Sequence, residues 1–348
     1  MGRRTQRGRG GALARVVAVV LLVAVLVAGG LFWHDFSRFG DAALSVRGQG
    51  DSIDIARGSS FRQIVRSVRG RGLSDAPALY WRLLAERMGV AGSLHAGEYA
   101  LPPGITARTL LQHMAQGKVL QRDITFVDGW NFGQLRAALA RAPRLVHDSA
   151  GLDDADLMRR IGAAGENPEG RFLPETYAYV KGDSDLDILE RAHAAMRKQL
   201  AAAWATRAPD LPLESPYQAL ILASIVEKET GRGDERARIA GVFVRRLRIG
   251  MPLATDPSVI YGMGSAYHGN IRKRDLQTDT PYNTYLHAGL PPTPIALPGK
   301  AAIEAALHPA PGDALYFVAR GDGSHVFSAT LAEHNRAVAC YQLKRCKQ

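Results

Sequence analysis

The hydrophobic pattern divides the chain into three regions. A continuous apolar run occupies residues 16–33, short strand-like runs followed by helical periodicity recur between residues 53 and 135, and amphipathic helical patterns dominate from residue 153 onward. Mixed short strands and helices after one long apolar segment predict an α+β protein with a single membrane helix.

The apolar run at residues 16–33 is long enough to cross a bilayer. Its 18 residues carry no charge, and at about 1.5 Å per residue they cover roughly 27 Å. Five arginines precede the run, so the positive-inside rule predicts a basic cytoplasmic tail at 1–15, a transmembrane anchor at 16–36 and an extracytoplasmic remainder. The alternative is a cleaved signal peptide, but the run exceeds an ordinary signal core and Trp33 suits a membrane interface. We therefore expect a single-pass protein of the cytoplasmic (inner) membrane.

A weak internal repeat follows the apolar run. Three segments read as a short strand, a glycine turn and an amphipathic helix, with turns at Gly58, Gly104 and Gly129 and inward positions at Ile64, Leu110 and Leu135. This arrangement resembles the start of small wall-glycan-binding modules of the LysM kind. We predict a LysM-like subdomain at 47–140, and a plain spacer from the membrane is the alternative.

The remainder reads as a mixed α/β domain over residues 150–343. Helical periodicity predicts helices at 185–205, 234–247, 302–308 and 331–343, with a further helix at 77–88 in the preceding region. Strands are expected at 314–320 and 325–328.

The segment at residues 215–231 is the strongest helix signal. Ser215 is a good N-cap, Pro216 suits the first turn, and Gly231 is expected to close the helix in the left-handed region. Residues 220–226 are almost wholly apolar, and Glu227 follows inside the helix. A carboxyl group entering a buried helix has its pKa raised unless it is paired, which suits general-acid chemistry. Periodicity does not choose between Glu227 and Glu229, because the two lie on different faces.

The charge distribution and the cysteine content argue against a metalloprotein and a nucleic-acid-binding protein. The net charge is +11, but five of the positive charges belong to the N-terminal tail, and neither zinc-ligand spacing nor an aromatic–basic nucleic-acid signature is found in the sequence. Cys340 and Cys346 lie six positions apart in the last nine residues. They would lie too far apart on a helix to bridge easily, and a disulfide requires an irregular tail. We predict no metal or other cofactor and no nucleic-acid partner.

Two stretches, 250–262 and 280–299, are predicted to be loops, and the second carries sugar-binding side-chain types on a proline-rich backbone. The loop at 280–299 contains Tyr282, Asn283 and Tyr285. Aromatic faces beside amide and carboxylate groups on rigid loops suit the apolar faces and hydroxyl rims of sugars. An earlier loop carries Glu175 and Tyr177.

Several segments together resemble the membrane-anchored endolytic murein transglycosylases, the MltG or YceG-like family. They occur in the family's order over roughly residues 170–340: Leu222-Ala-Ser-Ile-Val-Glu-Lys-Glu-Thr, Arg246-Leu-Arg-Ile-Gly-Met-Pro-Leu, Thr255-Asp-Pro-Ser-Val-Ile-Tyr-Gly, Tyr282-Asn-Thr-Tyr, Gly289-Leu-Pro-Pro and Tyr316-Phe-Val-Ala with His325-Val-Phe-Ser and His334-Asn. Three positions depart from the usual pattern, namely Ser258, Thr293 and Leu173-Pro-Glu.

The resemblance implies a fold, an activity and site residues. It implies a YceG-like catalytic domain that cleaves the MurNAc–GlcNAc β-1,4 bond inside peptidoglycan strands and leaves 1,6-anhydro-MurNAc ends. Glu227 matches the family's catalytic glutamate, and Glu229 is expected to support it. Further charge stabilisation is expected from Asp256, and glycan positioning from Tyr282, Asn283 and Tyr285, with Glu175 and Tyr177 on the opposite wall.

The implied partners are nascent glycan strands and the penicillin-binding proteins that polymerise them. A non-catalytic wall-binding scaffold for wall synthases is the chief alternative, and a hydrolase that leaves reducing ends is another. Peptide-bond cleavage lacks support, because no Ser/His/Asp or Cys/His arrangement stands out in the sequence.

Overall fold

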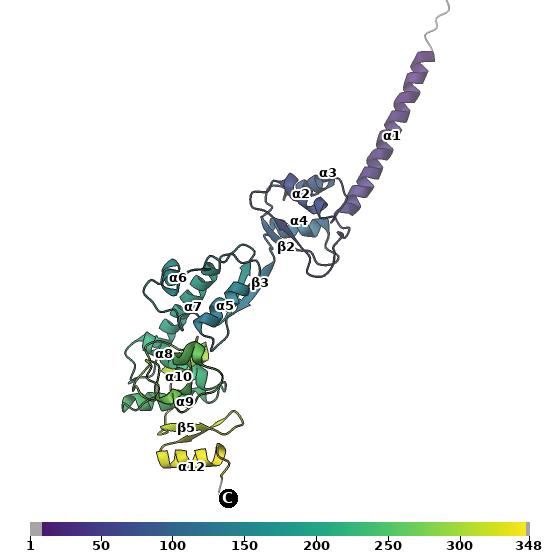
Figure 1. The fold of residues 1–348 in the computed structure, drawn as a ribbon. Helices are drawn as coiled ribbons and strands as arrows, with labels where there is room; N and C mark the ends of the chain where they lie inside the picture. Colours follow the sequence, from purple (N-terminus) through teal and green to yellow (C-terminus); the bar gives the residue numbers. More distant parts are fainter. Residues whose placement is uncertain (1–8, 346–348) are drawn as a thin grey trace, which may run out of the picture. The chain divides into compact units, whose positions relative to one another are not determined.

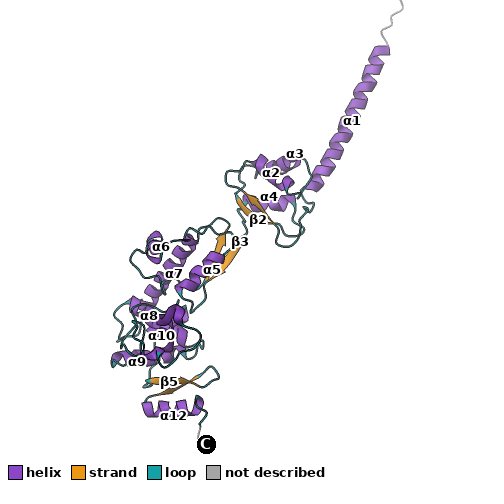
Figure 2. Cartoon of the chain, in the orientation of Figure 1, coloured by secondary structure: helices purple, strands orange, loops and turns teal. Residues whose placement is uncertain are grey.

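The computed structural model describes residues 9–345, with side chains from residue 13, and divides them into two compact units that meet at Gln121 and Arg122. Figure 1 shows the order of the elements along the chain, and Figure 2 shows that short strands are interspersed among helices. This α+β composition agrees with the prediction. The units are described in turn.

The first unit begins with the long apolar helix α1 (Arg9–Phe39). Its segment Leu13–Phe39 has a mean hydropathy of 2.8, and none of its most apolar window is buried in the protein, so its length and composition suit a membrane span. At its end, Phe36 and Phe39 pack against Tyr80 and Trp81, and the Tyr80 hydroxyl donates a 3.0 Å hydrogen bond to Asp35. The apolar helix therefore joins the rest of the first unit through an aromatic contact.

A two-stranded antiparallel sheet and three helices complete the first unit. The strands β1 (Ser52–Ile55) and β2 (Gly97–Ala100) pair with Ile53 opposite Tyr99. The helices α2 (Phe61–Gly70), α3 (Ala78–Arg87) and α4 (Ala107–Ala115) cover a core that includes Leu84, Leu101 and Leu110.

The first and third predicted strand–turn–helix segments form, and in the second the turn and helix form but the strand β2 ends at Ala100, one residue before the segment begins. Gly58, Gly104 and Gly129 have φ of 77°, 84° and 78°, which a residue with a Cβ adopts only with strain. Ile64, Leu110 and Leu135 are buried on the following helices. The third copy, however, packs in the second unit, so the predicted 47–140 subdomain is divided at 121/122. Its LysM-like character stays a prediction.

The second unit contains the rest of the third copy and the core around it. The strand β3 (Gln121–Thr125) pairs with β4 (Thr176–Val180), and α5 (Phe132–Arg141), α6 (Asp154–Arg160) and α7 (Asp185–Ala205) pack beside them. Phe126, Leu135 and Phe172 lie in their shared core.

The buried helix α8 (Pro216–Glu229) forms the second core of this unit. The Ser215 side chain accepts a 3.3 Å hydrogen bond from the Gln218 backbone, as its N-cap role predicts, and residues 219–226 are buried. The expectation for Gly231 is wrong, because the helix ends at Glu229, Thr230 is extended and Gly231 lies outside the left-handed region. As a result, the last turn carries both glutamates.

Helices and a hairpin surround α8. The helices α9 (Arg236–Arg248), α10 (Asp256–Met263) and α11 (Lys300–Leu307) pack against it. The hairpin of β5 (Tyr316–Ala319) and β6 (His325–Ser328) is covered by α12 (Leu331–Tyr341). The bounds of α9, α11, α12 and the two hairpin strands lie within a few residues of those predicted. The expectation of a loop over residues 250–262 is wrong in its second half, because α10 begins at Asp256 with Pro257 in its first turn. Cys340 lies on α12, and Cys346 lies outside the described residues.

Candidate active site

A pocket of about 560 Å³ lies at the C-terminal end of α8. Its walls come from the end of α8, the start of α10, the loop before α10, the β5–β6 hairpin and α12. Residues from five of the segments that suggested the family meet here, namely Glu229, Arg246, Asp256, Tyr285, Tyr316 and His325. The local reason is the termination of α8 at Glu229, which places that side chain where the buried helix reaches the pocket.

Glu229 has the electrostatic environment of a general acid. Burial raises the pKa of its carboxyl group to about 7, and the negative charge of Asp256 adds to that rise. A hydrogen bond from the Thr255 hydroxyl and the charges of His325 and Arg246 oppose it. A carboxyl group with this pKa is protonated in about half of the molecules near neutral pH. It can therefore give up a proton and take one back.

Asp256 supplies a second carboxylate to the same pocket. It is the first residue of α10, and its Oδ1 accepts a 2.6 Å hydrogen bond from the Tyr285 hydroxyl. The pKa of that hydroxyl is raised by burial and by Asp256, so Tyr285 remains a donor at neutral pH. Three of the predicted site residues, Glu229, Asp256 and Tyr285, thus line one pocket.

The side chains of Arg246 and His325 organise the pocket walls. The buried Arg246 guanidinium donates hydrogen bonds of 2.6 and 2.7 Å to the carbonyl oxygens of Leu253 and Leu315, joining the loop before α10 to the hairpin. The His325 ring bonds to Glu235 at 2.7 Å through Nδ1. Sequence reasoning did not single out Arg246, Thr255 or His325 as site residues, although all three lie in the quoted segments.

Glu227 lies elsewhere in the last turn of α8. Its Oε2 accepts a 3.0 Å hydrogen bond from the Gly299 backbone N–H, and its Oε1 lies 3.5 Å from the Arg236 guanidinium. Only 6% of its side chain is exposed. Burial raises its pKa, and the negative charge of Asp128 adds to the rise, while the Gly299 and Arg236 contacts oppose it. Glu227 does not line the pocket that contains Glu229.

The remaining predicted residues are dispersed. Tyr282 lines a second pocket, with its hydroxyl 2.9 Å from that of Thr293. Asn283 is fully buried and holds its own loop, because its amide donates to the carbonyl oxygens of Leu276 and Thr278 and its carbonyl accepts from the Tyr285 N–H.

Glu175 and Tyr177 are not brought to this pocket. Glu175 is exposed and forms an ion pair with Lys300. Tyr177 is buried, and its hydroxyl donates a 2.7 Å hydrogen bond to the Leu173 carbonyl oxygen. Neither lines the pocket of Glu229 or that of Tyr282. The described residues also contain no group of three or more His, Cys, Asp or Glu placed to hold a metal ion.

Comparison with known proteins identifies the family. The model of the YceG-like family matches residues 53–340 of this chain. The chain belongs to the YceG-like family. A solved YceG-like protein from Listeria monocytogenes has 28% sequence identity and a TM-score of 0.51, covering 82% of this chain and 98% of that one. The YceG-like fold expected from the sequence is confirmed.

Characterised YceG-like relatives carry an enzymatic name. The endolytic murein transglycosylase of Bacillus subtilis (strain 168) is 31% identical over 309 residues, which cover 83% of this chain and 84% of that protein. The endolytic murein transglycosylase of Streptococcus pneumoniae serotype 2 is 26% identical over 371 residues, which cover 94% of this chain and 65% of that protein.

Proposed function

We propose that this protein is an endolytic murein transglycosylase that cuts the MurNAc–GlcNAc β-1,4 bond within peptidoglycan strands and leaves 1,6-anhydro-MurNAc ends. Family membership and the names of both relatives support the activity. The single observation that carries the chemistry is the pocket at the end of α8, where the Glu229 carboxyl has a pKa of about 7.

We assign the catalytic acid to Glu229 in place of Glu227. Glu229 lines a pocket that a substrate can enter, and residues from several separate segments surround it. Glu227 instead accepts a hydrogen bond from the start of α11 and faces Arg236. This arrangement supports a positioning role for Glu227, which ties α8 to the N-terminus of α11.

One acid is sufficient for the proposed reaction. Protonated Glu229 donates its proton to the glycosidic oxygen as the bond from that oxygen to C1 of MurNAc breaks. Ionised Glu229 then accepts the proton of the MurNAc C6 hydroxyl, whose oxygen forms the new bond to C1. The leaving saccharide carries the first proton away, Glu229 regains its own, and no water is consumed. The Asp256 carboxylate, held by Tyr285, stabilises the positive charge that develops on the sugar ring.

The anchor gives the activity a location. With α1 across the cytoplasmic membrane and the N-terminus in the cytoplasm, the pocket lies on the extracytoplasmic side, where nascent strands emerge. Cutting there terminates strand elongation beside the penicillin-binding proteins that polymerise the glycan.

The assignment is tested with matched variants. Glu229→Gln and Glu227→Gln are incubated with uncrosslinked murein, and the glycan ends are analysed by mass spectrometry. We expect Glu229→Gln to lose anhydro ends by at least about a hundredfold, and Glu227→Gln to keep measurable activity. Undiminished anhydro ends with Glu229→Gln would contradict the assignment.

Hydrolysis is the second candidate. Asp256 places another carboxylate in the pocket of Glu229, and paired carboxylates are the apparatus of ordinary glycosidases. A hydrolase leaves reducing ends that differ from anhydro ends by the mass of one water. The same mass spectra of the unmodified protein therefore separate the two reactions.

A further inference from the structure

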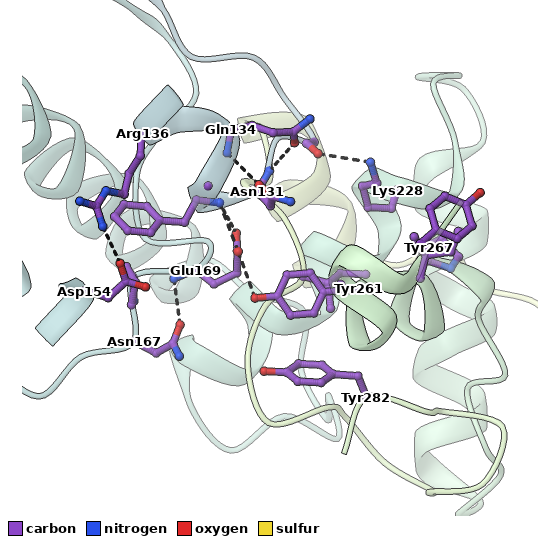
Figure 3. A pocket seen from close by; sticks show the side chains of 18 residues that line it. Asn131, Gln134, Arg136, Asp154, Asn167, Glu169, Lys228, Tyr261, Tyr267 and Tyr282 are labelled. Atoms are coloured by element: carbon purple, nitrogen blue, oxygen red, sulfur yellow. Dashed lines mark hydrogen bonds and ion pairs between the residues drawn. The ribbon is translucent and has the colours of Figure 1, made fainter. Parts of the chain in front are cut away.

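A larger pocket, of about 800 Å³, lies on the other side of α10 and has no assigned role. The N-terminal end of α5 forms one wall and α10 forms another (Figure 3). Its side chains combine three tyrosines with amide, ammonium and carboxyl groups: Asn131, Glu169, Lys228, Tyr261, Tyr267 and Tyr282.

Glu169 fixes the shape of this pocket. It is 5% exposed, both of its oxygens accept from the Phe132 backbone N–H at 3.1 and 3.2 Å, and Oε2 also accepts from the Tyr261 hydroxyl at 3.1 Å (Figure 3). Phe132 is the first residue of α5 and Tyr261 lies on α10, so one carboxyl group ties the two walls together. Its oxygens already have donors, and we therefore read Glu169 as a positioning residue and not as a second acid.

The aromatic side chains provide flat faces on a fixed frame. The Tyr261 and Tyr282 rings meet edge to face, with centroids 4.9 Å apart, and the Tyr282 hydroxyl is held by Thr293. Tyr267 is half-buried at the end of the 3-10 turn that follows α10. Tyrosine rings bind the apolar faces of sugars, and because Tyr261 and Tyr282 are held by their neighbours, these two lose little entropy on binding.

Lys228 supplies a cationic donor at the rim. Its side chain is exposed, and Nζ makes a 3.3 Å hydrogen bond to the Gly129 carbonyl oxygen, which leaves two of its three N–H donors for a ligand. An ammonium beside aromatic faces matches a saccharide that carries a carboxylate, as murein does in its stem peptides.

Two structural connections link this pocket to that of Glu229. Lys228 immediately precedes Glu229 on α8, and the two residues line different pockets. The helix α10 separates the pockets, since Asp256 lines the catalytic one while Pro257 and Tyr261 line the other. Consecutive Cα atoms are about 3.8 Å apart, so the walls of the two pockets come close to each other at Lys228–Glu229 and at Asp256–Pro257.

We propose that the pocket between α5 and α10 is a distal subsite that binds a second portion of the glycan strand being cut. The proposal rests on the proposed function, because it takes the ligand to be the same polymer. An enzyme that holds its substrate at two places prefers long strands, and such a preference suits cutting within a chain.

The subsite is tested by the length dependence of cleavage. Full-length wild-type protein in detergent and the variants Tyr267→Ala and Lys228→Met are given short and long fractions of uncrosslinked glycan strands. We expect kcat/KM on long strands to fall by about fivefold to tenfold in each variant, with a smaller loss on short strands, so that the preference for length declines. Tyr267→Phe, which keeps the ring, should retain the wild-type preference for long strands. Lys198→Met, an exposed lysine on α7 that lines neither pocket, is the matched control.

Binding separates this proposal from the catalytic one. In a Glu229→Gln background, the dissociation constant for long strands should rise when Tyr267→Ala is added. Equal losses on short and long strands, or no loss on either, would overturn the subsite. If the wild type cuts no glycan, the proposed function fails, whereas length-dependent binding of the Glu229→Gln protein still reports on the subsite.

Discussion

The Tyr285 hydroxyl donates a 2.6 Å hydrogen bond to Oδ1 of Asp256, and this bond joins a proline-rich loop to the first residue of α10. The two residues are far apart in the sequence, yet both line the pocket of Glu229. The bond fixes the direction in which the Asp256 carboxylate faces the pocket.

Removing this bond should lower activity without unfolding the protein. Tyr285→Phe keeps the ring and loses a hydrogen bond to a charged group, which is worth about 1.5–3 kcal/mol. We expect kcat to fall by about tenfold or more, measured as release of anhydro ends. Tyr341→Phe, on the exposed end of α12, is the control. Unchanged kcat in Tyr285→Phe would show that the bond does not serve the reaction.

The pH profile should report the Glu229 carboxyl group. Its first step requires the protonated acid, and burial raises its pKa to about 7, so kcat/KM should decline as pH rises through 7. A profile that stays flat up to pH 9 would contradict the assignment. The measurement is the initial rate on solubilised glycan strands at constant ionic strength.

The same group should make stability depend on pH. The folded pKa of Glu229 lies above its ordinary value of 4.5, so the folded state binds more protons than the unfolded state between these values. Stability therefore declines as pH rises from 4.5 to 7. Glu229→Gln removes this contribution and should raise the free energy of unfolding at pH 8 by about 3 kcal/mol, with little change at pH 4. Thermal unfolding of both proteins at the two pH values measures this difference, and an equal shift at both would count against it.

Gly299 should not tolerate a side chain. A Cβ there would lie 2.6 Å from Asp128 Oδ1, although its φ of −72° is ordinary. Gly299→Ala should therefore lower the free energy of unfolding by about 1–3 kcal/mol through overpacking. It should also displace the Gly299 N–H that donates a hydrogen bond to Glu227. Gly231→Ala, which meets open space, is the control. Adding Asp128→Ser should recover part of the loss in thermal stability, and failure to recover would point to a different cause.

Replacing Arg246 should be harmful even when the positive charge is kept. Its guanidinium bonds three carbonyl oxygens, those of Leu253, Pro252 and Leu315. The lysine ammonium is a compact group that cannot reach all three carbonyl oxygens with the geometry of the planar guanidinium. We expect Arg246→Lys to lower thermal stability by about 1–3 kcal/mol and to reduce glycan cleavage. The neighbouring Arg248→Lys, which is exposed and bonds one carbonyl oxygen, should change either property little.

Sequence patterns within a few residues predicted most helices and strands, but they predicted only part of the residues that meet in the pocket. The helix at Asp185–Ala205 has a capping box at Ser184 and a regular apolar face, and it is observed with the predicted bounds. The N-cap at Ser215 and the three glycine turns are similarly local. Each depends on contacts within a few residues, which a sequence pattern contains.

The choice between Glu227 and Glu229 depends on packing over long sequence distances. Glu229 becomes the pocket residue because Thr255 and Asp256, some 26 residues later, are folded against the end of α8. Glu169 was missed for the same reason, since its partners lie 37 residues before it and 92 after it. Tyr177 had a local signal that was not used, because it alternates with Tyr179 on β4 and both rings point into the core.

The aromatic contact between α1 and α3 has a mechanical consequence. Phe36 packs against Tyr80 and Phe39 packs against Trp81. The apolar helix is therefore connected to the rest of the first unit by side-chain contacts and not by a flexible linker. With α1 in a bilayer, a tilt of the helix would change the orientation of the rest of the first unit, because the two are joined rigidly. If α1 spans a bilayer, as we propose, the thickness of the lipid layer would then influence the orientation of this unit.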